Sequence, residues 1–92
     1  MAPASPFAAY VRAQLPPLGL APDREAEIVE ELAQQMDQTF EAALADGATT
    51  AAARAAAHAV VADWPALARE LVAAERSRAE RAVRQVARPL VE

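Results

Sequence analysis

Alanine is the residue that most limits the folds open to this chain, because it occupies 27 of the 92 positions. Alanine is the strongest helix former, and the chain has only two glycines and few β-branched residues. No segment shows the alternation of apolar and polar residues that a half-buried strand requires. We therefore predict an all-α fold, a small bundle of about four helices with a long C-terminal helix.

The hydrophobic core has to come from larger side chains, because the alanine methyl group buries little surface. There are 23 such apolar residues, which is enough for one domain with a modest core in a chain of 92 residues. Helical spacing selects the ones expected to meet in a single core. They are Ile28, Leu32, Met36, Phe40, Leu44, Val60, Trp64, Leu67 and Leu71, and Val29 and Ala33 are expected beside the stripe of the second helix.

Prolines and glycines predict where the helices begin and end. Ser5 followed by Pro6 is typical of an N-cap and a first helical residue. Pro22 can begin a second helix in the same way, and Gly47 can end it. The predicted helices cover residues 6–15, 22–46, 49–62 and 64–88.

The stretch DWPALAREL, residues 63–71, predicts a corner between two helices. Asp63 can accept a hydrogen bond from the free N–H groups of a new first turn, and Pro65 is tolerated there because it has no N–H. Thr49 or Thr50 can cap the preceding helix. Trp64 is the only tryptophan, and we expect it to pack in the core at this corner rather than to stack on a ligand.

The last helix is predicted to continue beyond the bundle, because no helix breaker occurs before Pro89. It either pairs with another surface or stands in solvent, supported by pairs such as Glu80 with Arg84. We therefore divide the chain into a helical bundle domain, residues 1–75, and a basic helical extension, residues 76–92.

An apolar helical spacing resumes in this extension after a charged gap, and a lone helix of this length is marginal in water. We therefore predict that the extension is a partner surface, and that a second copy of the chain binds it to form a homodimer. The copies would place either their small apolar stripes face to face or the basic extension of one against the acidic second helix of the other. The residues of this surface are Arg76, Arg81, Val83, Arg84, Val86, Arg88 and Leu90.

Charge is distributed unevenly along the chain. Residues 23–46 carry eight acids and one arginine, a sum of −7, whereas residues 76–92 carry five arginines and two glutamates, a sum of +3. The formal net charge of −4 argues against a nucleic-acid partner. No stretch approaches the roughly 20 apolar residues that span a bilayer, and no secretory leader pattern is present. We expect a cytoplasmic location.

No combination of residues predicts catalysis, a cofactor or a metal site. His58 is the only histidine and the chain has no cysteine, so the usual zinc ligand sets cannot be assembled. The carboxylates of the second helix are expected on an exposed face, where nothing would separate their pKa values. We predict that the protein is not an enzyme.

Two motifs and the residues between them carry a family resemblance. REAEIVEEL, residues 24–32, has the form R-E-x-E-I-x-x-E-L, and DWPALAREL follows Gly47 and a Thr49-capped alanine-rich segment. This order resembles the helical prefix domain at the N-terminus of certain bacterial ABC-type permeases and, more loosely, helical domains encoded beside PadR-type repressors. The matching positions are Arg24, Glu25, Glu27, Ile28, Glu31, Leu32, Gly47, Thr49, Asp63, Leu67, Ala68, Arg69, Glu70 and Leu71.

The chain departs from that family at Gln35, where histidine is frequent, and at Ala62, where glycine is usual. The resemblance implies a non-catalytic interaction or regulatory module in the cytoplasm, near the membrane and associated with a permease. The alternative is a self-associating structural domain, or a protein partner of a PadR-type repressor, with no link to transport. The residues alone leave both classes open.

Overall fold

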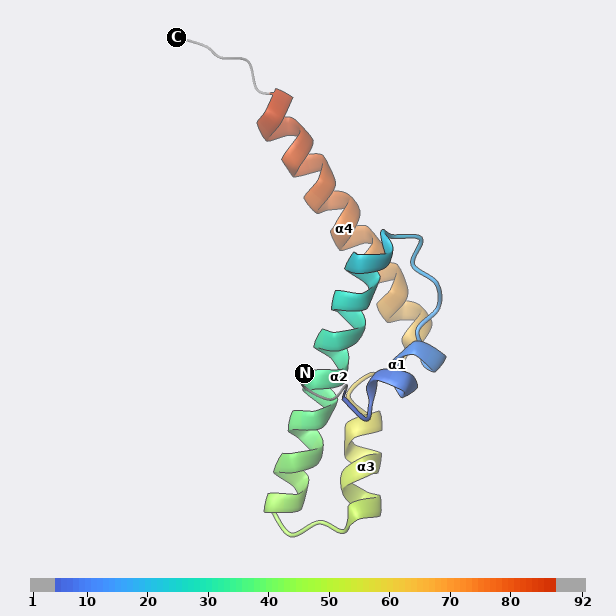
Figure 1. Cartoon of the computed structure of the whole chain (residues 1–92), viewed down its shortest axis with the longest axis vertical. Coiled ribbons are helices and arrows are strands. Elements are labelled where there is room, and N and C mark those ends of the chain that lie inside the picture. The colour runs from blue at the N-terminus through green and yellow to red at the C-terminus, as the bar shows by residue number, and fades with distance from the viewer. Residues whose placement is uncertain (1–4, 88–92) are drawn as a thin grey trace.

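The computed structural model describes residues 5–87, and the side chains as far as Gln85. Its helices are α1 (Ala8–Gln14), α2 (Pro22–Ala45), α3 (Thr50–His58) and α4 (Trp64–Ala87). The predicted all-α class with a long C-terminal helix is confirmed, since no strand occurs between residues 5 and 87. α3 packs along α2, α1 packs against α2 as well, and α4 projects past the N-terminal end of α2 (Figure 1).

The end of α2 is a complete Schellman motif centred on Gly47. The Gly47 N–H donates to the carbonyl of Leu44 at 3.0 Å, and the Ala48 N–H donates to the carbonyl of Ala43 at 3.0 Å. Gly47 has a φ of 94°, a conformation in which a side chain would be strained. The predicted helix stop at Gly47 is confirmed.

The two predicted side-chain caps are also present. Thr49 Oγ1 accepts a hydrogen bond from the Ala52 N–H at 3.1 Å, so Thr49 rather than Thr50 caps α3. Asp63 Oδ1 accepts one from the Ala66 N–H at 3.0 Å. The corner at residues 63–71 therefore begins as its sequence predicts.

α1 begins two residues later than predicted. Ser5 Oγ does accept the N–H of Phe7 at 3.1 Å, and the Ser5 carbonyl accepts the N–H of Ala8 at 3.0 Å. These bonds form a turn at residues 6–7 that leads into the helix. The capping contact of Ser5 is thus present, although Phe7 occupies the position before the first α-helical residue.

α3 is shorter than the predicted range 49–62, because it ends at His58. The N–H of Val60 bonds to the carbonyl of Ala57 at 3.2 Å, which tightens the last turn. Val60 and Val61 then pack against the core as half-buried residues. β-branched residues favour the helix less than alanine, so the chain can leave it at this point and reach the cap of α4.

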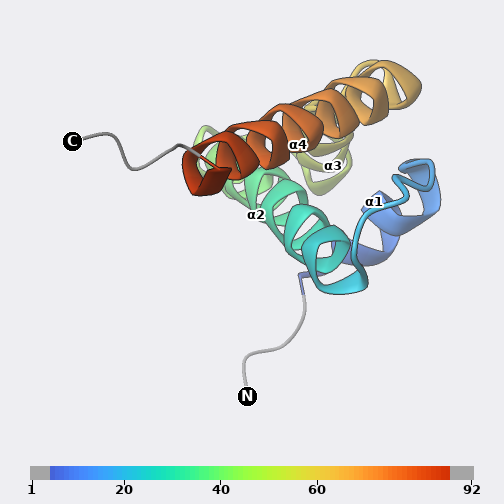
Figure 2. The same ribbon diagram turned by 90° about the horizontal axis from the view of Figure 1, so that it is seen from above.

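α2 and α3 approach closely because small side chains lie between them. Ala33 of α2 and both Ala53 and Ala57 of α3 have no exposed surface. α4 crosses α2 in the view from above (Figure 2). It is attached through larger side chains, among them Trp64, Leu67 and Leu71. Trp64 is 9% exposed, and its ring lies edge-on to that of Tyr10 in α1, with centroids 6.1 Å apart.

The buried residues form two clusters rather than the single core predicted from the sequence. Leu15 and Leu32 pack against both clusters and so connect them. The larger cluster consists of Phe7, Ala8, Val11, Val29, Ala33, Met36, Ala57 and Trp64. The smaller one consists of Leu18, Ile28 and Ala68, with Leu20, Leu71 and Val72 packed against it.

The buried face of α2 is rotated relative to the predicted stripe. Ile28 and Met36 are buried as expected, but Leu32, Phe40 and Leu44 are only half-buried. Val29 and Ala33, which were expected beside the stripe, are buried. The rotation follows from the position of α1, because Val11 of α1 and Phe7 just before it belong to the same cluster and are themselves buried.

The linker between α1 and α2 also belongs to the core. Leu18 is 6% exposed and packs with Ile28 and Ala68 in the smaller cluster. The N–H of Leu20 donates to Glu25 Oε2 at 3.0 Å, which fixes the linker to the first turn of α2. This linker therefore forms the surface against which α4 leaves the bundle.

Met36 has no exposed surface and lies in the larger cluster. We expect Met36→Ala to lower the free energy of unfolding by about 2 to 5 kcal/mol, because it leaves a cavity that the surrounding side chains fill only in part. Urea titration monitored by circular dichroism measures this loss. Leu44→Ala is the matched control, since Leu44 is half-buried and outside both clusters, and equal losses would contradict the assigned core.

The cap of α4 makes a second prediction. Asp63→Ala should lower the free energy of unfolding by about 0.5 to 2 kcal/mol, because the Ala66 N–H loses its acceptor. Asp63→Asn and Asp63→Ser keep an acceptor and should be much milder. Thermal unfolding of the three variants tests this, and an asparagine variant as unstable as the alanine variant would exclude capping as the reason.

Candidate functional site

The predicted partner surface lies on the part of α4 that projects from the bundle (Figure 1). Every side chain from Arg76 to Gln85 is exposed, and Val83 is 65% exposed. The structure therefore brings Arg76, Arg81, Val83 and Arg84 together on one exposed length of helix. None of the four contributes to either core cluster.

The remaining predicted residues of this surface are less completely described. Val86 lies within α4, but only its backbone is described. Arg88 and Leu90 lie outside the described residues. The predicted surface is thus represented by its N-terminal half.

Two open grooves run along α4 where it passes the linker and the end of α2. One has a volume of about 450 Å³ and is lined by Pro16, Pro17, Pro65, Ala68, Arg69, Val72, Ala73 and Arg76. The other has a volume of about 490 Å³ and is lined by Leu18, Gly19, Leu20, Ala21, Arg24, Val72, Glu75, Arg76 and Ala79. A third depression, of about 410 Å³, lies on the projecting helix and is lined by Arg76, Ala79, Glu80, Val83 and Arg84.

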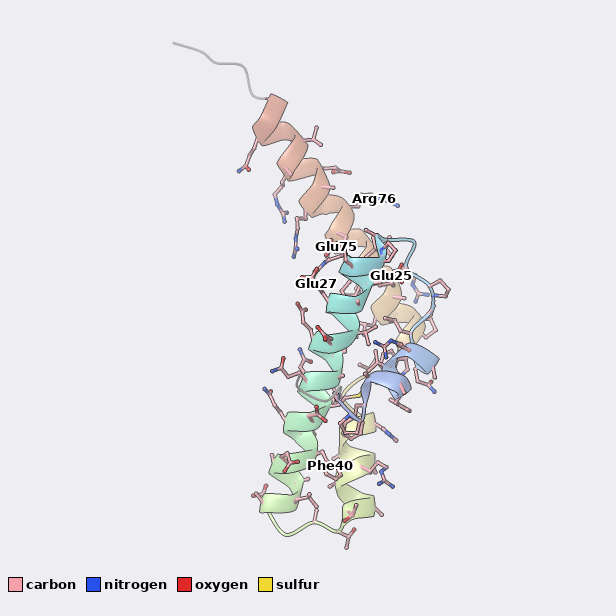
Figure 3. All side chains as sticks on the ribbon, in the orientation of Figure 1. Glu25, Glu27, Phe40, Glu75 and Arg76 are labelled. Atoms are coloured by element: carbon pink, nitrogen blue, oxygen red, sulfur yellow. The ribbon has the colours of Figure 1, made fainter. Side chains whose placement is uncertain are left out.

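A charged cluster joins α2 to α4 at the point where the projecting part begins (Figure 3). Arg24 donates from Nε to Glu75 Oε1 at 2.9 Å, and its Nη2 forms an ion pair with the same oxygen at 2.7 Å. The Glu75 side chain is only 17% exposed and that of Arg24 is 25% exposed. Arg78 Nη1 lies 3.8 Å from the same carboxylate, so two arginines surround Glu75.

The same arginine also faces the acidic surface of α2. Arg24 Nη1 lies 3.8 Å from Glu27 and 4.0 Å from Glu31, whose side chains are 64% and 66% exposed. These two contacts are long and exposed to solvent, so they contribute little to stability. The contact of Arg24 with Glu75 is the one that positions α4.

This geometry lowers the pKa of Glu75 below its ordinary value of 4.5. The hydrogen bond from Arg24 is the main cause, and the charges of Arg24 and Arg78 act in the same direction, whereas partial burial opposes them. The hydrogen bond with Glu75 likewise raises the pKa of Arg24. Glu75 is therefore held in its charged form as the bundle folds.

The contact between Arg24 and Glu75 was not predicted from the sequence. The two residues are 51 positions apart, so no helical spacing relates them. The available signal was that Arg24 is the one basic residue in the acidic segment 23–46, which suggests a partner beyond its own helix.

His58 lies at the boundary between core and solvent. It is half-buried, and its ring stacks on that of Tyr10 with centroids 3.9 Å apart and planes at 11°. Phe7 approaches it edge-on at 5.9 Å. In the part of the chain that the structure describes, no group of three or more histidines, cysteines or acids is arranged to hold a metal ion.

Neither the comparison with protein families nor those with characterised proteins and solved structures finds a match to this chain. Within residues 5–87, no helix is both long enough and apolar enough to cross a membrane.

The lowered pKa of Glu75 makes the stability of the bundle depend on pH. The ionised carboxylate stabilises the fold above its unfolded pKa, and this contribution is lost as the pH falls through the lower folded pKa, that is, below about pH 4.5. We expect Glu75→Gln to remove this part of the acid sensitivity, and Arg24→Gln to reduce it. Thermal midpoints measured from pH 6 to pH 3 test the expectation.

Glu70→Gln is the control for this series, because Glu70 is an exposed acid on the same helix. It should keep the acid sensitivity of the unmodified chain. If Glu75→Gln and Glu70→Gln have the same pH dependence, the contact with Arg24 does not hold Glu75 in its charged form.

Proposed function

We propose that this chain is a non-catalytic helical interaction module, cytoplasmic and membrane-proximal, of the kind that precedes bacterial ABC-type permeases. The observation that carries the proposal is the projecting part of α4, where Val83 is 65% exposed on a helix that has already left the core. A helical segment of this length is marginal in water without further contacts. A partner that covers it supplies those contacts.

The residues that carry the family resemblance support the proposal by their roles in the fold. Gly47 ends α2, Thr49 caps α3 and Asp63 caps α4. Arg24, also part of the resemblance, binds Glu75 at the beginning of the projecting helix. These positions determine the lengths of the helices and the direction in which α4 leaves, which are the properties that a docking module requires.

The composition of the grooves supports a binding role over catalysis. The three grooves along α4 are lined by apolar residues, arginines and two glutamates, and by no histidine, serine or threonine. They therefore contain no nucleophile paired with a base. Apolar side chains bordered by arginine are instead suited to a protein partner, because arginine is enriched at protein interfaces.

Val83→Asp tests the proposal. It places a charge on the exposed face of α4, so the thermal midpoint should change little while a partner bound there is lost. The tagged chain and its variant are expressed in the cell of origin, cross-linked and recovered from solubilised membranes. Mass spectrometry should identify an integral membrane permease that is recovered with the unmodified chain and lost with Val83→Asp.

Ala51→Asp is the matched control, because Ala51 is exposed in the first turn of α3. That end of α3 is the one remote from the projecting part of α4 (Figure 1). It should leave the permease bound. Recovery of a PadR-type repressor in place of a permease would favour the alternative function. A set of recovered proteins that is the same for Val83→Asp and the unmodified chain would contradict a binding role for this surface.

A further inference from the structure

The packing face of α4 continues beyond the bundle. Ala68 is buried and Val72 is half-buried where α4 packs on the linker and on α2. Ala79 and Val83 follow Val72 by seven and eleven residues, which places them within about 20° of it around the helix. The face of α4 that packs on the linker and on α2 in the first half of the helix is therefore exposed to solvent in the projecting half.

The uncovered length of helix is basic. Arg76, Arg78, Arg81 and Arg84 are exposed there, against a single acid, Glu80, between residues 76 and 85. An occupant of this surface therefore has to offer an apolar contact for Val83 and several negative charges around it.

The outer face of α2 in the same chain has the complementary charge. Glu27, Glu30, Glu31 and Glu41 are all exposed on it. The one arginine of α2, Arg24, lies 2.7 Å from Glu75 and makes only long contacts, of 3.8 Å and 4.0 Å, with Glu27 and Glu31. Its single charge leaves the face acidic, and Glu30 and Glu41 lie outside these contacts. The two surfaces belong to one molecule, but they do not lie against each other, because the projecting helix extends past the N-terminal end of its own α2 (Figure 1).

The lengths of the two surfaces agree. The projecting helix from Arg76 to Ala87 is about 17 Å long, and the acidic face of α2 from Glu27 to Glu41 extends for about 21 Å. A second copy of the chain can thus place its basic helix along the acidic helix of the first. In a two-fold dimer every such contact occurs twice, which doubles the area that one short helix can bury.

We infer that the occupant of the projecting helix is a second copy of this chain, in a two-fold dimer in which residues 76–87 of each copy lie along the outer face of α2 of the other. The inference rests on the proposed function: the second copy covers the projecting helix and the permease binds the dimer, so Val83→Asp loses the permease because it separates the two copies. Charge complementarity selects this occupant over an anionic membrane, which would repel the acidic α2 as it attracted the basic helix.

Charge reversal on each surface separately tests the arrangement. Arg81→Glu with Arg84→Glu makes the projecting helix acidic, and Glu30→Arg with Glu41→Arg makes the outer face of α2 more basic without changing Arg24, Glu27 or Glu31. Sedimentation equilibrium should show that the full chain dimerises and that each double variant raises the dissociation constant by at least about tenfold. An equimolar mixture of the two variants should recover part of the dimer, because one of its contacts keeps the original charges and the other sets the two introduced glutamates against the two introduced arginines.

Several results would overturn the inference. A full chain that is monomeric at all concentrations excludes the dimer, as does its binding as a monomer to vesicles that contain phosphatidylserine. The two double variants could also differ. If Arg81→Glu with Arg84→Glu weakens the dimer but Glu30→Arg with Glu41→Arg does not, the two projecting helices pair with each other instead. Circular dichroism checks that each variant is folded, and Arg81→Gln with Arg84→Gln replaces the reversal if it is not.

The dimer and the permease can be distinguished by these experiments. A monomeric chain that still recovers a permease through Val83 would overturn the second copy as occupant and leave the proposed function in place. A chain that dimerises but recovers no permease would contradict the proposed function and leave the second copy as the occupant.

Discussion

The contact between α2 and α3 is the constraint on which the other helices depend, because it fixes the platform that they cover. Three alanines with no exposed surface let the two helices approach closely. This pair of helices leaves one side of α2 open, and Val11 of α1 and Phe7 just before α1 pack there. Trp64, at the start of α4, packs in the same cluster. A larger residue in place of Ala57 would push α3 outward and so disturb each of these additions.

The sequence predicts the helices well and the side-chain contacts between distant segments poorly. Gly47, Thr49 and Asp63 act on backbone groups within a few residues of themselves, so their roles can be read locally. The buried face of α2 depends instead on where α1 lies, which no periodicity within α2 contains. The stripe was therefore predicted to run through Leu32, Phe40 and Leu44, which are half-buried, whereas Val29 and Ala33, expected only beside it, are buried.

The candidate surface shows the same division. Its location on α4 follows from local signals, namely the absence of a helix breaker and the return of apolar spacing at Val83. The contact of Arg24 with Glu75 joins residues 51 positions apart, and only the fold brings them together. The boundary placed after residue 75 therefore coincides with a contact that the sequence did not reveal.

The corner at Trp64 has a mechanical consequence. α4 is a single uninterrupted helix from Trp64 to Ala87, about 35 Å long, and the contacts that hold it lie in its first half. The half of α4 that projects is therefore a rigid rod anchored at Glu75. A change of about 10° in its direction there would move the Ala87 end, about 18 Å further along the helix, by about 3 Å.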